Sequence, residues 1–306
     1  MENNQMTEAR TLLSHVKGER IDKFLASTQK DLSRSQIYIM MSNGLVTVNG
    51  NVVKPSYKLK QGELVELKVV YSGSNNLIPQ NIPVDVVYED TDLLVINKRA
   101  GMVVHPGPGH NIDTLANAIL GRMPNMVGVG ENFRPGIVHR LDKNTSGLMV
   151  IAKNSKAHEN VANQIKEREV LKIYLTLVTG TIVKQEGIII SNIGRDPKNR
   201  KRMAVVEKGK YSESWYKVVE KFDKYTLLEV TLKTGRTHQI RVHFSSIGHP
   251  IFGDIQYGVR NPMVNRHFLH SSKLGFRLPS TGTYVEFESD IPYDLHNVLN
   301  EIRDNN

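Results

Sequence analysis

An isolated carboxylate, Asp142, stands in the segment PGIVHRLDKNTSGLMVIAKN, residues 135–154, between two apolar runs typical of buried strands, 136–138 and 148–152. Arg140 precedes it by two residues, so on an extended segment the two side chains can point the same way. A carboxylate taken out of water at such a turn needs a cation or hydrogen-bond donors, and it can then act as a base or a nucleophile. The alternative is an aspartate that caps backbone N–H groups of the turn, and the spacing alone favours that alternative.

Two other segments offer partners for a carboxylate. In LKIYLTLVTG, residues 171–180, alternation predicts a strand with an aliphatic face and a polar face that carries Tyr174. In TGRTHQIRVHFSSIG, residues 234–248, we expect a short helix N-capped by Thr237 with Arg241 beside its buried stripe. That stripe would consist of Ile240, Phe244 and Ile247. Taken singly, the tyrosine is more simply a side chain that covers the sheet, and the arginine a member of a surface salt bridge.

Three histidines in the same region, His238, His243 and His249, suggest a metal-dependent hydrolase as an alternative. His238 and His243 are five residues apart, which is a poor spacing for one helix face, and Gly248 ends the helix before the third histidine. We therefore expect no metal site.

The elements that must position these residues fall into two groups. Residues 16–72 contain two helix patterns followed by strands that turn at Asn49-Gly50, a strong hairpin signal. Residues 73–83 are rich in Ser, Asn and Pro and predict a linker, and residues 1–15 are expected to form an N-terminal tail. From 84 to 306 the strands are not separated by regular crossover helices. This favours an α+β fold with a mixed, mostly antiparallel central sheet flanked by helices and loops.

Composition restricts the class of protein. The 306 residues carry a formal net charge of +9 with a pI near 9.5, which suits a polyanionic partner. The chain has no cysteine, which excludes disulfides, thiolate zinc sites and cysteine nucleophiles. The N-terminus lacks an apolar signal region, and no apolar run approaches the roughly 20 residues that cross a bilayer. We expect a soluble, cytoplasmic protein with no membrane partner.

Positive charge is concentrated in GRDPKNRKRMAVVEKGK, residues 194–210. The run contains Arg195, Lys198, Arg200, Lys201, Arg202, Lys208 and Lys210. A basic run by itself is usually a solvated face, so it indicates nucleic acid only where a nucleic-acid site lies beside it.

Three ordered blocks together resemble the RluA/RluD-type RNA pseudouridine synthases. GIVHRLDKNTSGLMVIAKN is similar to the HRLDxxTSG signature of that family, and LKIYLTLVTG to its KxYxAxVxG strand. GRTHQIRVHFSSIGHPIFGD is similar to its GRTHQIRxHxxxxGxPxxGD segment, and the module within residues 16–72 resembles an S4 RNA-binding domain, small and α/β. The resemblance covers about residues 16–295. Arg99 and Thr176 depart from the usual proline and alanine, but neither is a chemical residue.

The resemblance implies that the protein isomerises uridines in RNA, most simply in 23S ribosomal RNA or a ribosomal precursor particle, without cofactor or metal. Asp142 would be the essential carboxylate acting on a flipped-out uridine, and Arg241 would pair with it. Tyr174 would stack on the base or help to remove its C5 proton. Arg140 would fill the vacated position or contact its phosphate, and His139 and Thr145 would shape the loop.

RNA binding would be supplied by cations and by residues at a helix N-terminus, from two elements. They are Arg200, Lys201 and Arg202 of the basic run, and Ser33, Arg34, Gln36 and Lys54 of the S4 domain. One alternative is a member of the same family that targets tRNA. Another is a ribosome-associated S4 protein without catalysis, in which Asp142 could be lost freely. The modified uridine and the choice between a glycal and a covalent adduct stay open, and nothing demands more than a monomer.

Overall fold

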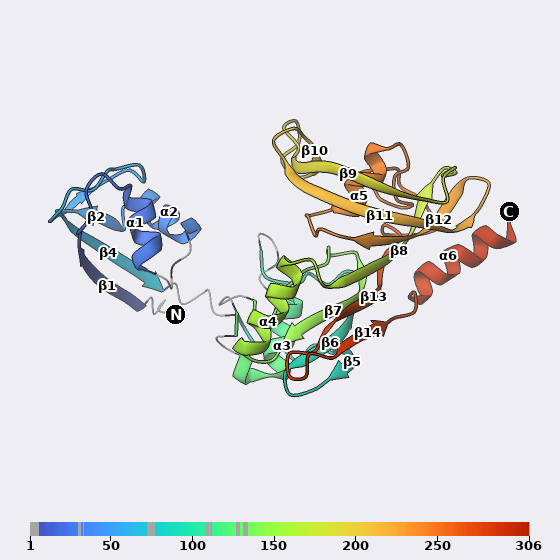
Figure 1. Ribbon diagram of the computed structural model, residues 1–306, viewed down its shortest axis with the longest axis horizontal. Coiled ribbons are helices and arrows are strands. Elements are labelled where there is room, and N and C mark those ends of the chain that lie inside the picture. Colours follow the sequence, from blue (N-terminus) through green and yellow to red (C-terminus); the bar gives the residue numbers. More distant parts are fainter. Residues whose placement is uncertain are drawn as a thin grey trace. The chain divides into compact units, whose positions relative to one another are not determined.

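The computed structural model describes residues 6–29, 32, 34–71, 77–107, 110, 112–126, 129–130 and 134–305. The chain divides into two compact units, Met1–Asn76 and Leu77–Asn306 (Figure 1). Each unit has a hydrophobic core of its own, as expected of a domain. Among the described helices, none is both long and apolar enough to span a bilayer.

The first unit is a small antiparallel sheet packed against two helices. Its strands lie in the order β1 (Met6–Leu13), β4 (Leu64–Tyr71), β2 (Val46–Val48), β3 (Asn51–Val52). Helices α1 (Ile21–Thr28) and α2 (Arg34–Ser42) bury Phe24 and Ile37 in the core that these strands share. Asn49 and Gly50 have φ angles of 49° and 77°, so the predicted hairpin turn is confirmed.

Strand β1 differs from the tail expected over residues 1–15. Its residues pair in antiparallel register with β4 over their whole length, from Met6 opposite Tyr71 to Leu13 opposite Leu64. The strand lies at the sheet edge and its sequence, MTEARTLL, lacks a clear alternation of apolar residues. Among its described side chains only Leu12 packs against the core of this unit, so the sequence pattern offers little sign of the strand that backbone pairing forms.

The second unit is built on one sheet, which has ten strands within the described residues. The strand order is β10-β9-β11-β12-β8-β13-β7-β6-β5, with β14 also paired to β13. Their bounds are β5 (Asp85–Glu89), β6 (Leu93–Lys98), β7 (Ser146–Ala152), β8 (Leu171–Thr179), β9 (Glu186–Arg195), β10 (Met203–Val205), β11 (Lys210–Lys221), β12 (Tyr225–Leu232), β13 (Leu269–Arg277) and β14 (Tyr284–Glu288). Strands β13 and β7 pair in parallel and the other described pairs are antiparallel, which confirms the predicted mixed sheet.

Helices pack against different strands of this sheet (Figure 1). They are α3 (Leu115–Arg122), α4 (Ser155–Lys166), α5 (Gln239–Ser246) and α6 (Tyr293–Asp304), with a 3-10 turn at Pro124–Met126. Helix α4 buries Val161 in one cluster with Val150 of β7. Helix α5 packs Phe244 edge-on against Tyr216 of β11, with ring centroids 5.8 Å apart. All of β7 is buried, so the strand that follows Asp142 is fixed on both faces.

One strand prediction needs correction, and the burial of a second strand goes beyond what was predicted. Residues 136–138 form no strand and make a single bridge, Ile137 to Ile151. In β8 the polar face is the more buried one: Lys172, Tyr174 and Thr176 are 8%, 6% and 0% exposed. The reason is that β8 is a central strand covered on both faces. The Thr176 hydroxyl, for example, donates to the carbonyl of Phe268 at 2.8 Å.

Helix α5 also differs from its prediction at both ends. Its N-cap is His238 in the left-handed region, with φ 57°, and not Thr237. Within the described residues no side chain caps the helix, and Gln239 Oε1 instead accepts from the backbone N–H of Arg236 at 2.9 Å in the preceding turn. Ile247 follows the last turn and is 43% exposed, so it lies outside the buried stripe.

Candidate active site

The turn that carries Asp142 is held in place by hydrogen bonds that its backbone carbonyl groups accept. The N–H of Thr145 donates to the carbonyl of Asp142 at 3.1 Å and closes the turn. The buried Lys98 Nζ, whose pKa is lowered by burial to about 7, donates to the carbonyl of Lys143 at 3.2 Å. The Arg266 guanidinium donates to the carbonyl of Asn144 at 3.1 Å. Two basic side chains therefore fix consecutive peptide groups beside the carboxylate.

Gly147 lets this turn lie against the neighbouring strand. Its φ is 113°, and a Cβ atom built there would stand 2.3 Å from the carbonyl oxygen of Ser271 in β13. This is the point where β7 and β13 pair in parallel. A side chain at 147 would separate the strands and displace the Asp142 turn.

Asp142 and Arg241 form a buried ion pair although they are 99 residues apart. Arg241 Nη1 donates to Asp142 Oδ2 at 3.0 Å, and the two side chains are 8% and 16% exposed. Asp254 holds the other edge of the guanidinium, accepting from Nε at 2.7 Å and from Nη2 at 3.0 Å. Gln256 accepts a further bond from Nη2 at 3.0 Å. Arg241 is thus fixed by a bidentate carboxylate and presents Nη1 to Asp142.

This arrangement keeps Asp142 ionised. Burial acts to raise the pKa of the Asp142 carboxyl, but His238, Arg241 and His267 act against it and the net pKa lies below the usual value. Burial also lowers the pKa of both histidines, that of His267 to about 4, so both are neutral near pH 7. The Arg241 guanidinium is therefore the cation that maintains the carboxylate at neutral pH.

His238 joins the carboxylate to a tyrosine. Its Nε2 lies 3.8 Å from Asp142 Oδ2, and its Nδ1 is 2.7 Å from the hydroxyl of Tyr257. That hydroxyl also accepts from the backbone N–H of Met203 at 2.8 Å, so Tyr257 joins His238 to the backbone of β10.

A cavity of about 580 Å³ opens beside this pair, within the usual size range of ligand sites. Asp142, Tyr174 and Arg241 all line it, together with the apolar side chains of Leu232 and Leu269. Burial, opposed by a hydrogen bond with Ser271 and aided by the Asp142 carboxylate, raises the pKa of Tyr174 above its usual value. Tyr174 therefore stays protonated at neutral pH, which favours a packing role over that of a base.

The other predicted residues of the signature have different surroundings. Arg140 is exposed and lines both this cavity and a second one of about 450 Å³ that also reaches Asp142. His139 accepts from the backbone N–H of Val150 at 3.0 Å, and burial lowers its pKa to about 3, so it is a neutral internal acceptor. Thr145 is buried with its hydroxyl 2.8 Å from His267 Nε2. The internal contacts of His139 and Thr145 support the turn itself.

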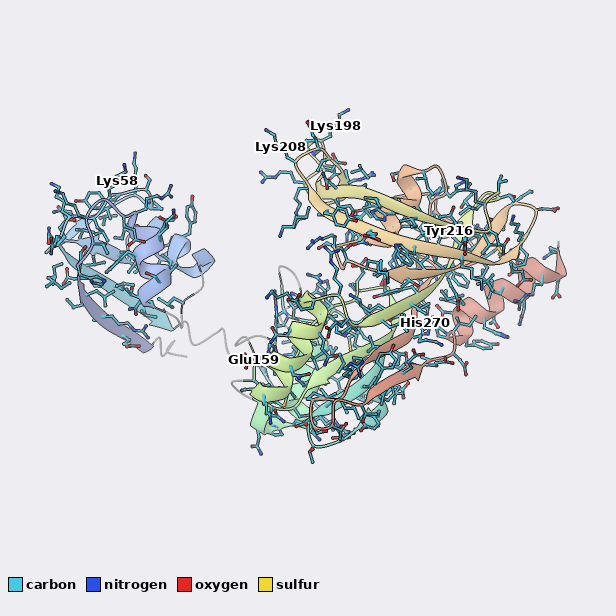
Figure 2. The ribbon with its side chains drawn as sticks, in the orientation of Figure 1. Lys58, Glu159, Lys198, Lys208, Tyr216 and His270 are labelled. Carbon is cyan, nitrogen blue, oxygen red and sulfur yellow. The ribbon has the colours of Figure 1, made fainter. Side chains whose placement is uncertain are left out.

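The basic run forms the end of the β9–β10 hairpin. Figure 2 shows Lys198 and Lys208 projecting from this end of the sheet. Arg200 and Lys201 are exposed, whereas Arg202 lies with its guanidinium 4.9 Å from the ring centroid of Tyr257. The hairpin is also tied to the site by Gln256, whose Nε2 donates to the carbonyl of Lys201 at 3.2 Å.

The predicted residues of the first unit are described only in part. Ser33 lies outside the described residues, as do the side chains of Arg34 and Gln36. The backbone of Arg34 and Gln36 belongs to the first turn of α2. Lys54 is exposed after β3.

The three histidines of the metal alternative have separate partners. His243 is fully buried between the hydroxyls of Ser212 and Ser214, at 2.8 and 3.0 Å. His249 Nδ1 lies 2.9 Å from the carbonyl of Thr179. Within the part of the chain that the structure describes, no group of three or more His, Asp or Glu could hold a metal ion.

Sequence reasoning assigned no part to several residues that the structure places in the site. They are Lys98, Asp254, Gln256, Tyr257, Arg266 and His267. Asp254 had a signal in the sequence, because it is the last residue of the block GRTHQIRVHFSSIGHPIFGD that resembles the family segment. Gly253 before it has a φ of 73°, and a Cβ there would meet the carbonyl oxygen of Arg266 at 2.5 Å.

Comparisons with known proteins show the family to which this chain belongs. The chain matches a family model described as RNA pseudouridylate synthase over residues 92–246, and an S4 domain model over residues 19–65. It is 45% identical over 296 residues to an uncharacterised RNA pseudouridine synthase of Bacillus subtilis, covering 96% of this chain and 98% of that protein.

Two further matches come from a named relative and a solved structure. The chain is 39% identical over 300 residues to ribosomal large subunit pseudouridine synthase D of Pseudomonas aeruginosa, covering 94% of this chain and 92% of that protein. Human RNA pseudouridylate synthase domain containing 1 superposes with a TM-score of 0.58 at 28% identity, over 73% of this chain and 96% of that chain. The chain therefore belongs to the RNA pseudouridine synthase family and is an enzyme with an N-terminal S4 domain.

Proposed function

We propose that this enzyme isomerises one or more uridines of large-subunit ribosomal RNA, with Asp142 as its essential carboxylate. In the reaction the N1–C1′ bond breaks, the uracil turns, and C5 bonds to C1′. C5 loses one proton and N1 gains one, so the reaction needs no oxidant, reductant or added group. A carboxylate can assist as a base or as a nucleophile, and Asp142 suits either role.

The observation that carries the proposal is the pairing of Asp142 with Arg241 at the wall of a cavity. The carboxylate is 16% exposed, it lines the cavity, and its pKa is lowered, so it is ionised and reachable at neutral pH. Tyr174, protonated and 6% exposed, would pack against the extruded uracil. Arg140, exposed between the two cavities, would contact the backbone or the place that the flipped base leaves.

Large-subunit RNA is favoured by the relative from Pseudomonas aeruginosa, whose name states that substrate and which aligns along nearly the whole chain. The exposed cations Arg200 and Lys201 of the hairpin, with Lys54 and the α2 N-terminus of the S4 unit, would supply phosphate contacts. Such contacts give affinity without sequence preference, so the uridine would be chosen by RNA shape.

The test is a pseudouridine map of total RNA from a strain that lacks the gene. We expect one or more positions of 23S RNA to lose the modification. The wild-type gene should restore them, and Asp142→Asn, expressed at the same level, should not. If the lost position lies in a tRNA, the ribosomal substrate is wrong. If Asp142→Asn restores modification, the assigned role of Asp142 is wrong.

A further inference from the structure

One face of β11 is aromatic and open to solvent. Tyr211 and Trp215 are 40% and 42% exposed. They alternate with Ser212 and Ser214, whose hydroxyls contact His243 of α5, so the two rings lie on the face of β11 that is turned away from α5. Large aromatic side chains this open to solvent are a common mark of a binding surface.

Glu213 fixes both rings from its place between them. The Tyr211 hydroxyl donates to Glu213 Oε2 at 2.5 Å, and the Trp215 indole N–H donates to Glu213 Oε1 at 2.6 Å. The polar atom of each ring therefore has a partner within the strand. Ring area stays exposed, and holding the rings in one geometry lowers the ordering cost of binding a flat partner.

Cations flank the two rings and connect them to the active-site cavity. Lys233 Nζ lies 4.3 Å from the Trp215 ring centroid, and the Arg168 guanidinium lies 5.6 Å from that of Tyr211. Arg236 Nε donates to the carbonyl of Tyr211 at 3.0 Å. All three cations also line the cavity that contains Asp142 and Tyr174. The aromatic face is thus continuous with the proposed site of chemistry.

The charge of that cavity favours a polyanion. Among its described lining residues, eight are Arg or Lys, and Asp142 is the one carboxylate. A partner protein could instead use the exposed Ile188 and Ile190, which lie opposite Trp215 and Glu213 on β9. The cations on both rings and their continuity with an RNA-modifying site favour nucleic acid over an apolar protein surface.

We propose that Tyr211 and Trp215, with Arg168, Lys233 and Arg236, form a second RNA contact, here named the β11 platform. Extrusion of the target uridine unstacks its neighbours, and the platform would stack one or two flanking bases while the cations contact their phosphates. The inference rests on RNA being the substrate, as the family membership states. It requires neither the choice of 23S RNA nor the role of Asp142.

Trp215 is the single tryptophan of the chain, so its fluorescence reports on the platform directly. We would titrate the full-length enzyme with a ten-nucleotide oligouridylate and, separately, with an abasic ribose-phosphate oligomer of equal length and charge. Saturable quenching by the oligouridylate, with little quenching by the abasic oligomer, is the expected result. Equal quenching by both, or none by either, would overturn base stacking.

Variants provide the second measurement. Tyr211→Ala and Trp215→Ala should each weaken binding of the oligouridylate and of total ribosomal RNA by about ten-fold, and Trp215→Phe should restore most of the loss. Tyr284→Ala is the matched control, because Tyr284 is 43% exposed on β14 and its hydroxyl likewise donates to a glutamate two residues on, Glu286, at 3.0 Å. That control should bind as the wild type does.

Because binding is measured without turnover, failure of the platform and failure of the proposed substrate are distinct outcomes. If the platform variants bind RNA like the wild type, the platform is wrong whatever RNA is modified, and this face fits a protein partner instead. If the platform variants bind RNA weakly while no 23S position depends on the gene, the platform is supported and the proposed ribosomal substrate is wrong.

Discussion

The Asp142 turn and the β9–β10 hairpin are both charged, yet they are built in opposite ways. The Asp142–Arg241 pair is buried, and the Arg241 guanidinium has three fixed partners in Asp142, Asp254 and Gln256. At the hairpin, Arg200 and Lys201 lie in solvent. The difference matches two tasks: chemistry needs a carboxylate held in one place and one ionisation state, whereas phosphate binding needs only nearby positive charge.

The two regions are nevertheless joined through two side chains. Tyr257 links His238 to the backbone of Met203, and Gln256 links Arg241 to the carbonyl of Lys201. The base of the hairpin is therefore part of the scaffold of the site, while its tip is a binding arm. Substitutions at the turn should reduce turnover, those at the tip should reduce affinity, and those at the links should have a small effect on turnover.

Among substitutions of the groups that hold Asp142 in place, the largest effect is expected for Arg241→Gln. It leaves Asp142 and the fully buried Asp254 without their shared cation, and removal of one partner from a buried pair costs about 3–5 kcal/mol of stability. We also expect turnover at pH 7 to fall by about 100-fold or more, because the Asp142 carboxylate is no longer held ionised. Arg241→Lys keeps the charge but loses the planar guanidinium group. Its stability and turnover should lie between those of the wild type and those of Arg241→Gln. Urea unfolding followed by Trp215 fluorescence and single-turnover rates would measure both effects.

The same variant has a pH signature whose sign follows from the pKa shifts. The pKa values of Asp142 and Asp254 are both lowered in the fold, so their contribution to stability is present above the ordinary carboxyl value of about 4 and is lost as the pH falls through their lowered values. The stability gap between wild type and Arg241→Gln should therefore be widest near pH 7 and narrow at low pH. The acid limb of the variant's rate profile should move to higher pH. A gap that is constant with pH would contradict the ion-pair account.

Substitutions at the hairpin tip should change affinity alone. The triple variant Lys198→Ala, Arg200→Ala, Lys201→Ala should weaken RNA binding by about ten-fold or more at 0.15 M salt, with saturated turnover unchanged. The slope of log K against log salt should fall by about 2, because each lost single-strand phosphate contact removes about 0.7.

A matched control removes three exposed lysines at the other end of the same strands. Lys184→Ala, Lys221→Ala, Lys224→Ala makes the same change in net charge just before β9, at the end of β11 and just before β12. It should leave the salt slope nearly as in the wild type. Equal slopes for the two triple variants would mean that total charge, and not the hairpin, binds RNA.

A link between the regions is tested by Tyr257→Phe. The variant keeps the ring beside Arg202 and Arg241 but loses the hydroxyl that joins His238 to Met203. Two hydrogen bonds are lost, each worth about 0.5–1.5 kcal/mol, and only the one to His238 acts next to Asp142. Saturated turnover should therefore fall about 2- to 10-fold with RNA affinity unchanged. Tyr293→Phe, at an 80% exposed tyrosine, serves as the control. If RNA affinity fell while turnover stayed the same, Tyr257 would act in RNA binding and not in the active site.

The smallest effect is expected for Lys54→Ala in the S4 unit. Its single exposed charge can supply one phosphate contact, so RNA binding should weaken about 2- to 3-fold with turnover at saturation unchanged. Lys60→Ala, an exposed lysine of the same unit to which the account assigns no contact, is the comparison. Filter binding at two salt concentrations would measure the RNA affinity of both variants.

The sequence predicted the elements of the site better than the contacts between them. Alternation and turn residues predicted β8 and the Asn49-Gly50 hairpin, because those signals are local. The two faces of β8 were predicted, but the burial of its polar face was not, since burial depends on what covers a central strand. The Asp142–Arg241 pair spans 99 residues, and no periodicity predicts such a contact. The family resemblance suggested it, whereas Asp254 and Tyr257, whose roles depend on tertiary packing, were missed.

The most direct test of the account is a single-turnover assay of Asp142→Asn with saturating 23S RNA. The substitution keeps the size of the side chain and removes its charge, and RNA binding measured in parallel shows whether the fold and the binding arm are intact. The account predicts normal binding with pseudouridine formation reduced by about 1000-fold or to nothing. Pseudouridine formed at a rate near that of the wild type would contradict it.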